Sequence, residues 1–380
     1  MSYRDRMTSP GPKKLLALDG GGIRGVITLE VLLRLESLLA EQLGAGHEFV
    51  LGDYFDYIAG TSTGAVIAAG LAKGLRVEQI LDVYVARGQE MFDHASLRRR
   101  YRYRYGSQRL RELLRRMLGE DTTLGSDDLK TLLLIVVRNA TTDSPWPLSN
   151  NPNALFNDPT QADNNLAIPL WQLVRASTAA PTYFPPEIVT VGGRDFVFVD
   201  GAVTMYSNPA FQLFLMATLD AYRLRWPATE SDLLLVSVGT GTTPKADDRL
   251  RPGNMNLLFN VNSVPAALMY AALNQQDLLC RVFGRCRHGA PIDLEVGDLM
   301  HAEGLLENRL FSYVRYNADL SRRGLDEVGL NDVIPEEVQR LDSIEHLGDL
   351  RRVGQAAARD VIAEHFAGFL GAGRDIAIPS

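Results

Sequence analysis

The chain has 380 residues, of which 46% are hydrophobic and 22% charged, and its formal net charge is −7. This composition is typical of a folded protein with a large core, and the acidic balance argues against a nucleic-acid polymer as the main partner. No run reaches the roughly 18 apolar residues of a membrane-spanning helix, and the first twelve residues lack the apolar core of a signal peptide. The only two cysteines, Cys280 and Cys286, suit small buried side chains in a reducing compartment. We therefore expect a cytoplasmic protein.

In chain order, segments of strand length alternate with helical segments, which predicts an α/β sandwich. The predicted strands are residues 13–19, 55–59, 131–138, 195–201 and 232–238. The predicted helices are residues 26–43, 65–74, 76–89 and 171–180.

Composition divides the chain into three parts. Residues 1–12 are charged and contain Pro and Gly, so we expect a flexible tail. Residues 13–250 carry the alternating pattern and form the main domain, in which residues 141–165 are rich in Pro, Asn and Asp and are expected to be mostly loop. Residues 251–380 are predicted to be mainly helical and packed on the main domain, with one strand at residues 291–296.

The stretch DGGGIRG, residues 19–25, follows the first predicted strand and precedes a helix. Gly20, Gly22 and Gly25 fit the G-x-G-x-x-G spacing of a dinucleotide-binding loop. Such a loop requires an acidic residue about twenty positions later, at the end of the second strand, to bind the ribose.

The second predicted strand does not supply that acid, because it runs directly into Gly60, while Glu36 and Glu41 fall in or at the end of the predicted helix. Closely spaced glycines at a helix start instead present backbone N–H groups with no side chain in the way. This arrangement suits an oxyanion hole better than a cofactor site.

The pentapeptide GTSTG has the G-x-S-x-G form of a nucleophile elbow. It lies between a predicted strand and a predicted helix, as the elbow mechanism requires, and comprises Gly60, Thr61, Ser62, Thr63 and Gly64. Small flanking residues permit the tight turn that exposes the serine, and the following helix N-terminus favours negative charge. The motif predicts Ser62 as a nucleophile.

A nucleophilic serine needs a base, and three residues are candidates. His288 and His301 would complete the order of an α/β-hydrolase triad, but neither follows a predicted strand in a recognisable loop. Asp200 ends a predicted strand, where its carboxylate can reach the same edge of the sheet as Ser62. Asp200 is therefore the preferred base, although an Asp-Gly pair by itself is also a common turn.

These motifs together resemble the patatin-like phospholipase family over about residues 13–245. The segments that carry the resemblance are DGGGIRG (19–25), GTSTG (60–64), VRASTAAPTYFPP (174–186), DGA (200–202), SNPA (207–210) and VSVGTG (236–241). The resemblance implies a three-layer α/β/α sandwich with a mostly parallel central sheet. It also implies hydrolysis of acyl esters of membrane glycerophospholipids through an acyl-serine intermediate, with no metal and no organic cofactor.

Residue by residue, the resemblance implies a Ser62–Asp200 dyad without a catalytic histidine. The oxyanion hole would be the glycine loop, with amides from the first three glycines, Arg24 beside them and Gly25 closing the loop. The members of this predicted oxyanion loop are Gly20, Gly21, Gly22, Arg24 and Gly25.

An arginine-rich segment at residues 97–116 contains nine arginines and one glutamate. Its densest part comprises Arg98, Arg99, Arg100, Arg102 and Arg104. Three interpretations stay open: a solvated helical face, a surface for anionic headgroups at the inner membrane face, and a site for a phosphorylated activator. The third interpretation comes from the family resemblance, since compact bacterial patatin-like proteins of similar size include antiphage effectors activated by cyclic dinucleotides.

The leading hypothesis is a lipid acyl hydrolase whose activity is controlled by a cyclic nucleotide and which contacts membranes peripherally. The alternatives are a constitutive lipid esterase and a non-catalytic ligand-binding module that keeps the fold. An oligomer is compatible with the sequence.

Overall fold

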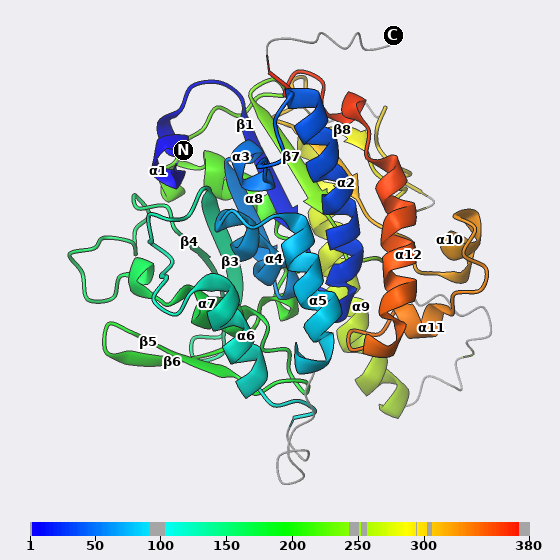
Figure 1. Ribbon diagram of the computed structural model, residues 1–380, viewed down its shortest axis with the longest axis horizontal. Coiled ribbons are helices and arrows are strands. Elements are labelled where there is room, and N and C mark those ends of the chain that lie inside the picture. Colours follow the sequence, from blue (N-terminus) through cyan, green and yellow to red (C-terminus); the bar gives the residue numbers. More distant parts are fainter. Residues whose placement is uncertain are drawn as a thin grey trace.

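The computed structural model describes residues 2–91, 103–242, 251, 257–293, 295–301 and 306–371. Its core is one mixed, mostly parallel sheet with the strand order β5-β6-β3-β2-β1-β7-β9-β8, and β4 pairs with β3 (Figure 1). The strands are β1 (Lys13–Leu18), β2 (Tyr57–Thr61), β3 (Leu132–Asn139), β4 (Ser144–Ser149), β5 (Glu187–Val191), β6 (Arg194–Asp200), β7 (Leu233–Val238), β8 (Arg285–His288) and β9 (Ser312–Tyr316).

Helices cover both faces of this sheet. They are α1 (Tyr3–Thr8), α2 (Gly25–Leu43), α3 (Leu51–Tyr54), α4 (Thr63–Ala72), α5 (Val77–Met91), α6 (Gln108–Leu118), α7 (Leu170–Ser177), α8 (Ala210–Thr218), α9 (Leu257–Phe283), α10 (Arg322–Glu327), α11 (Pro335–Val338) and α12 (Leu347–Ala357). In Figure 1, α2, α5 and α12 lie in front of the sheet and α9 passes behind it. The three-layer α/β/α sandwich and the mostly parallel sheet are confirmed.

The central strands are buried on both faces because helices cover them on both sides. In β1, which pairs in parallel with β2 and β7, the residues from Leu15 to Leu18 are fully buried. The sequences of β1, β3 and β7 are therefore continuous apolar runs, without alternation of apolar and polar residues. Because such runs are easily recognised, the bounds of all three strands were predicted to within one residue.

The sheet extends beyond the expected boundary at residue 250. Strands β8 and β9 come from the C-terminal part of the chain, and β9 pairs with β7 in parallel. This part is mainly helical as predicted, but it also completes the central sheet. The strand predicted at residues 291–296 is wrong, since Asp293 and Gly297 form only an isolated bridge around a turn.

The segment at residues 141–165 is not all loop. Strand β4 lies within it and pairs antiparallel with β3, where Pro145 is opposite Arg138 and Pro147 is opposite Val136. Proline lacks the N–H that a central strand needs on both sides, so the two prolines suggested a loop. An edge position such as that of β4 tolerates them.

The N-terminal segment is not the flexible tail that was expected for residues 1–12. It contains α1, in which Tyr3 is fully buried and Arg6 is 4% exposed. The guanidinium of Arg6 makes an ion pair with the buried carboxylate of Asp56 and donates to two backbone carbonyl oxygens. Helix α1 is therefore part of the folded domain.

We predict that Arg6→Met lowers the free energy of unfolding by about 3 kcal/mol, because it removes the closer ion pair of the buried Asp56 carboxylate, at 3.3 Å, and leaves the more distant Lys14 ammonium, at 4.0 Å. Arg4→Met, which removes the exposed ion pair of Arg4 with Asp127, should change it by less than about 1 kcal/mol. Urea denaturation of both variants and the wild type measures the difference. Equal effects of the two substitutions would contradict the structural role assigned to α1.

Candidate active site

Strands β2 and β6 end at neighbouring positions along β3. Strand β2 runs parallel to β3 and its last residue, Thr61, is opposite Val136, whereas β6 runs antiparallel and its last residue, Asp200, is opposite Val137. The two strands therefore run toward each other and deliver the residues at their ends to one place. Ser62 Oγ donates a hydrogen bond to Asp200 Oδ2 at 2.7 Å, although the two residues are 138 positions apart.

Ser62 occupies a strained turn between β2 and α4. Its φ is 55° and its ψ is −122°, a backbone conformation that side-chain-bearing residues rarely adopt outside functional sites. The turn is tight enough that a Cβ at Gly60 would lie 2.1 Å from the carbonyl oxygen of Gly64, and a Cβ at Gly64 would lie 2.3 Å from that of Leu18. Both positions therefore require glycine, as the elbow motif predicted.

A side-chain relay fixes the backbone of the turn. The N–H of Ser62 donates to Ser177 Oγ at 2.9 Å, and the Ser177 hydroxyl donates to the carbonyl oxygen of Val136 at 2.6 Å. Ser177 is the last residue of α7, within the VRASTAAPTYFPP segment. The relay shows why that segment belongs with the elbow: it ties the strained turn to β3.

The hydroxyl groups of both elbow threonines are hydrogen-bonded to neighbouring segments. The hydroxyl of Thr61 donates to the carbonyl oxygen of Tyr206 at 2.6 Å, and Thr63 Oγ1 is hydrogen-bonded to the buried hydroxyl of Tyr84. Both threonines are buried, so they act on the shape of the turn.

Asp200 is held as a buried acceptor. Its Oδ1 accepts the N–H of Ala202 at 2.8 Å, which leaves Oδ2 for the hydroxyl of Ser62. Burial raises the pKa of Asp200 to about 6 despite these hydrogen bonds. A carboxylate with a pKa near the working pH is suited to taking and returning a proton.

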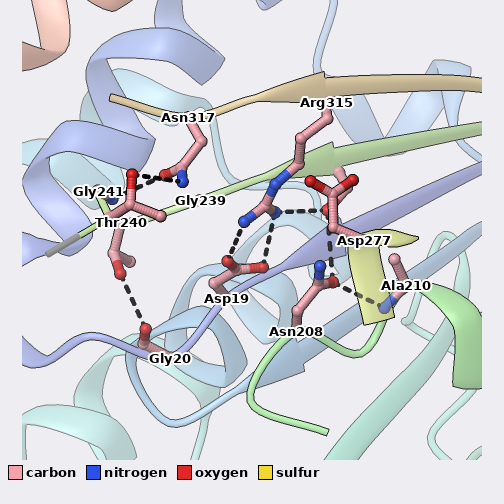
Figure 2. A network of polar contacts seen from close by, with 12 residues as sticks. Asp19, Gly20, Asn208, Ala210, Gly239, Thr240, Gly241, Asp277, Arg315 and Asn317 are labelled. Carbon is pink, nitrogen blue, oxygen red and sulfur yellow. Dashed lines mark hydrogen bonds and ion pairs between the residues drawn. The ribbon is translucent and has the colours of Figure 1, made fainter. Parts of the chain in front are cut away.

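The glycine loop is anchored through its first glycine. The N–H of Gly20 donates to the carbonyl oxygen of Ser207 at 2.9 Å, and the carbonyl oxygen of Gly20 accepts the hydroxyl of Thr240 at 2.8 Å (Figure 2). The expectation that the Gly20 amide points toward an oxyanion is therefore corrected, because that amide is committed to the backbone after β6.

The amides of Gly21 and Gly22 have no acceptor among the residues that the structure describes, and both glycines line the same cavity as Ser62. Gly22 has a φ of +61°, and a Cβ there would lie 2.3 Å from the carbonyl oxygen of Leu341. Glycine at this position is thus required by both conformation and space. The two amides are available to a negative oxygen beside Ser62.

Arg24 and Gly25 complete the loop. The buried guanidinium of Arg24 lines the cavity and donates to the carbonyl oxygen of Gly21 at 3.4 Å, and burial lowers its pKa to about 10. Gly25 begins α2, and a Cβ there would lie 2.4 Å from Thr63 Oγ1. Gly25 therefore allows the glycine loop and the elbow to pack against each other.

A buried ion pair lies directly behind the glycine loop. Arg315 of β9 makes two hydrogen bonds to the carboxylate of Asp19, at 2.9 and 2.6 Å, and donates a third to Ser237 Oγ of β7 at 2.6 Å (Figure 2). All three residues are buried. Sequence reasoning missed Arg315, because a single arginine in a short C-terminal segment carries no local signal of a site.

Ser62, Asp200 and the glycine loop open into one cavity of about 710 Å³. This is within the usual volume of a small-molecule site. Most of its wall is apolar, and the apolar lining includes Val66, Met91, Leu110, Phe184, Ala266, Met269, Leu273 and Leu341. A flexible hydrocarbon chain fits such a wall better than a polar ligand does.

The histidines and cysteines considered from the sequence lie elsewhere. His288 is on β8 at the far edge of the sheet, where its ring stacks on His365 with centroids 4.5 Å apart. His301 is exposed, and neither His288 nor His301 is among the described residues that line the cavity. Cys280 and Cys286 are both buried, as predicted.

Only part of the arginine cluster is described by the structure. The members outside the described residues are Arg98, Arg99, Arg100 and Arg102. Arg104 lines the cavity, pairs with Asp342 at 3.4 Å and lies over the ring of Tyr183, 4.9 Å from its centroid. Further along, Arg111 pairs with the buried Glu187 at 2.8 Å, so some of these arginines stabilise the fold.

The sequence of the chain is similar to those of several known proteins. The sequence model described as patatin-like phospholipase matches residues 16–214. A cGAMP-activated phospholipase of Vibrio cholerae serotype O1 is 33% identical over 239 residues, which are 60% of this chain and 64% of that protein. A protein of the same name from Escherichia coli strain TW11681 is 29% identical over 236 residues, 60% of this chain and 62% of its own length. Patatin-17 of Solanum cardiophyllum is 30% identical over 262 residues, 61% of each chain. The matched part thus spans less than two thirds of each relative.

We predict that Asp200→Asn stabilises the fold at alkaline pH. Because burial raises the pKa of Asp200 to about 6, the folded chain keeps a proton there that the unfolded chain releases above its ordinary pKa of 3.8. The wild type therefore loses stability as the pH rises through about 6, and an amide of the same shape avoids this loss. The gain should be about 3 kcal/mol at pH 8 and about half as large at pH 5.

Thermal unfolding of Asp200→Asn and of Ser62→Ala at both pH values measures this difference. Ser62→Ala keeps the buried carboxylate, so its stability relative to the wild type should not rise with pH in the same way. If Asp200→Asn changed the stability equally at pH 5 and pH 8, burial would not raise the pKa of Asp200.

Proposed function

Since this chain belongs to the patatin-like phospholipase family, we propose that it hydrolyses acyl esters of membrane glycerophospholipids. The observation that carries the proposal is the hydrogen bond between Ser62 Oγ and Asp200 Oδ2 inside an apolar cavity. Ser62 is the nucleophile and Asp200 the general base of this proposed dyad, and the reaction passes through an acyl-serine.

In the acylation step, Ser62 Oγ attacks the ester carbonyl carbon while its proton passes to Asp200 Oδ2, 2.7 Å away. The carbonyl oxygen becomes negative and accepts the N–H groups of Gly21 and Gly22, which have no other acceptor among the described residues. When the tetrahedral intermediate collapses, the bond to the leaving alcohol oxygen breaks, and Asp200 returns the proton to that oxygen. The lysolipid leaves and the acyl group stays on Ser62.

In the deacylation step, a water molecule takes the place of the lysolipid. Asp200 accepts one of its protons as the water oxygen attacks the acyl-serine carbonyl carbon, and the same two amides hold the negative oxygen. Collapse of this intermediate returns the proton to Ser62 Oγ and releases the fatty acid. No histidine takes part in either step.

Two further features favour a lipid substrate. The apolar wall of the cavity suits an acyl chain, and the guanidinium of Arg24 places a positive charge beside the glycine loop. In a largely buried setting this charge stabilises a negative oxygen more strongly than it would in water. We therefore assign Arg24 an electrostatic role in the proposed oxyanion site.

We further propose that cGAMP or a related cyclic dinucleotide activates the enzyme, in bacterial antiphage defence at the cytoplasmic face of the inner membrane. Two relatives are named as cGAMP-activated phospholipases, although the matched part covers less than two thirds of each. The pair formed by Arg104 and Tyr183 at the cavity offers a cation and an aromatic ring, the groups that recognise phosphates and bases. A constitutive lipid esterase is the alternative.

Ser62→Ala should lower fatty-acid release from phospholipid vesicles by at least about a thousandfold, because Ser62 has the one hydroxyl, among the described residues that line the cavity, that is hydrogen-bonded to Asp200. His288→Ala and His301→Ala are matched controls that should retain wild-type turnover. Mass spectrometry of the released fatty acid and lysolipid measures all three. Wild-type turnover by Ser62→Ala, or loss of turnover in either histidine variant that still folds, would reject the dyad.

The activity should fall on the acidic side with an apparent pKa near 6, since burial raises the pKa of Asp200 to about 6 and only the ionised carboxylate accepts a proton. The measurement is kcat/KM for a water-soluble short-chain ester between pH 4.5 and 8.5. If kcat/KM instead fell with an apparent pKa near 4, Asp200 would not be desolvated in the working enzyme.

Addition of cGAMP should raise vesicle hydrolysis by between about 5-fold and 150-fold, the usual range of an allosteric coupling. Cyclic AMP, which has one phosphate and one base, is the control and should have little effect. A high rate that does not change with any cyclic nucleotide would instead establish the constitutive esterase.

A further inference from the structure

Helix α9 begins with an unusually long uncharged stretch. Residues 257–276 contain no Asp, Glu, Lys, Arg or His, in a chain of which 22% is charged. In the described part of the helix, buried side chains occur only after Gln275, at Gln276, Asp277, Cys280 and Arg281, and no described side chain between Ser263 and Gln275 is buried. The uncharged half of α9 therefore lies at the surface of the molecule, in the lower right part of Figure 1.

The described side chains of this half form two stripes on opposite sides of the helix, because a helix turns about 100° per residue. The inner stripe lines the cavity and comprises Ala266, Met269, Tyr270 and Leu273. The outer stripe is exposed and comprises Val264, Ala267, Leu268 and Ala271. Val264 is 48% exposed and Leu268 is 66% exposed.

A helix at a water-exposed surface usually carries charged residues on its outer side. The outer stripe has none, so its burial against an apolar partner would be favourable, by roughly 25 cal/mol per Å². Within the described part of the chain, no helix is long and apolar enough to span a membrane. A partner that contacts α9 from one side fits the stripe better than insertion across a bilayer does.

The position of the stripe identifies the partner. The opposite side of the same helix is the wall of the cavity that contains Ser62, and the exposed Val203 also lines that cavity. Met205, two residues further on, is 46% exposed. Exposed apolar side chains thus come from two segments that border one cavity, whose proposed substrate is a bilayer component.

We propose that the outer stripe of α9 is the membrane-docking surface of this protein and inserts into the apolar boundary of the bilayer. This inference rests on the proposed function. An acyl chain then reaches Ser62 by passing along the inner stripe of a helix whose other side is in the membrane. Because the stripe carries no charge, docking depends on apolar burial and persists at high salt, unlike docking through arginines.

The test is the binding of full-length protein to phosphatidylcholine vesicles at 0.1 M and 0.5 M NaCl, by sedimentation. The double variant Val264→Asp/Leu268→Asp should bind at least about tenfold more weakly than the wild type at both salt concentrations, because two charges cannot enter the apolar boundary. The control is Leu43→Asp/Leu219→Asp, which replaces the last residue of α2, 38% exposed, and the residue directly after α8, 46% exposed. It should bind like the wild type.

A second variant tests the contact directly. Tryptophan at position 268 (Leu268→Trp) should shift its fluorescence to shorter wavelength when vesicles are added and should tighten binding, because tryptophan favours the bilayer interface. The proposal is overturned by wild-type binding of the Asp double variant, by loss of wild-type binding at 0.5 M NaCl, or by absence of the fluorescence shift. A dimer of the wild type that the Asp double variant dissociates would assign the stripe to a second copy of the chain.

Hydrolysis of a soluble short-chain ester separates this inference from the proposed function. The Asp double variant should keep Ser62-dependent turnover of the soluble ester while losing turnover of vesicles. Absence of Ser62-dependent turnover in the wild type on both substrates, with and without cGAMP, would reject the hydrolase. Retained vesicle turnover by the Asp double variant would reject the docking surface alone.

Discussion

The buried ion pair between Asp19 and Arg315 is the interaction on which the arrangement of the site depends. It joins the residue directly before the glycine loop to β9, 296 positions away, and the hydroxyl of Ser237 on β7 completes it. A bidentate, charge-assisted pair of this kind has little freedom, and removal of either partner would leave a buried charge. The loop amides are therefore held in position before any substrate arrives, as electrostatic catalysis requires.

Around this anchor, the site combines several features that oppose stability. Ser62 has a strained backbone, Asp200 is a carboxylate buried away from water, and the amides of Gly21 and Gly22 lack acceptors among the described residues. The packed sheet offsets these costs, since β2 and β6 end at adjacent positions of β3 and cannot shift without breaking its register. The strained backbone of Ser62 persists because the surrounding contacts fix the position of the turn.

The sequence predicted the features that depend on local rules. The elbow, the strands that carry it and the helix after the glycine loop follow from short patterns of glycine and apolar residues. It did not predict that the Gly20 amide is occupied, because its acceptor, Ser207, is distant in the chain. Nor did it predict β9, since Arg315 interrupts the apolar pattern of a buried strand. Helix α1 was missed although its capping box of Ser2 and Asp5 was visible.

The position of Arg315 so late in the chain has a consequence for biosynthesis. While a ribosome is still making the protein, Ser62, Asp200 and the glycine loop all emerge before the strand that pairs with Asp19. A chain that ends before β9 would lack the partner of Asp19 and would leave that buried carboxylate as an unpaired charge beside the glycine loop. The proposed active site can therefore be completed only after folding has extended to the C-terminal strand β9.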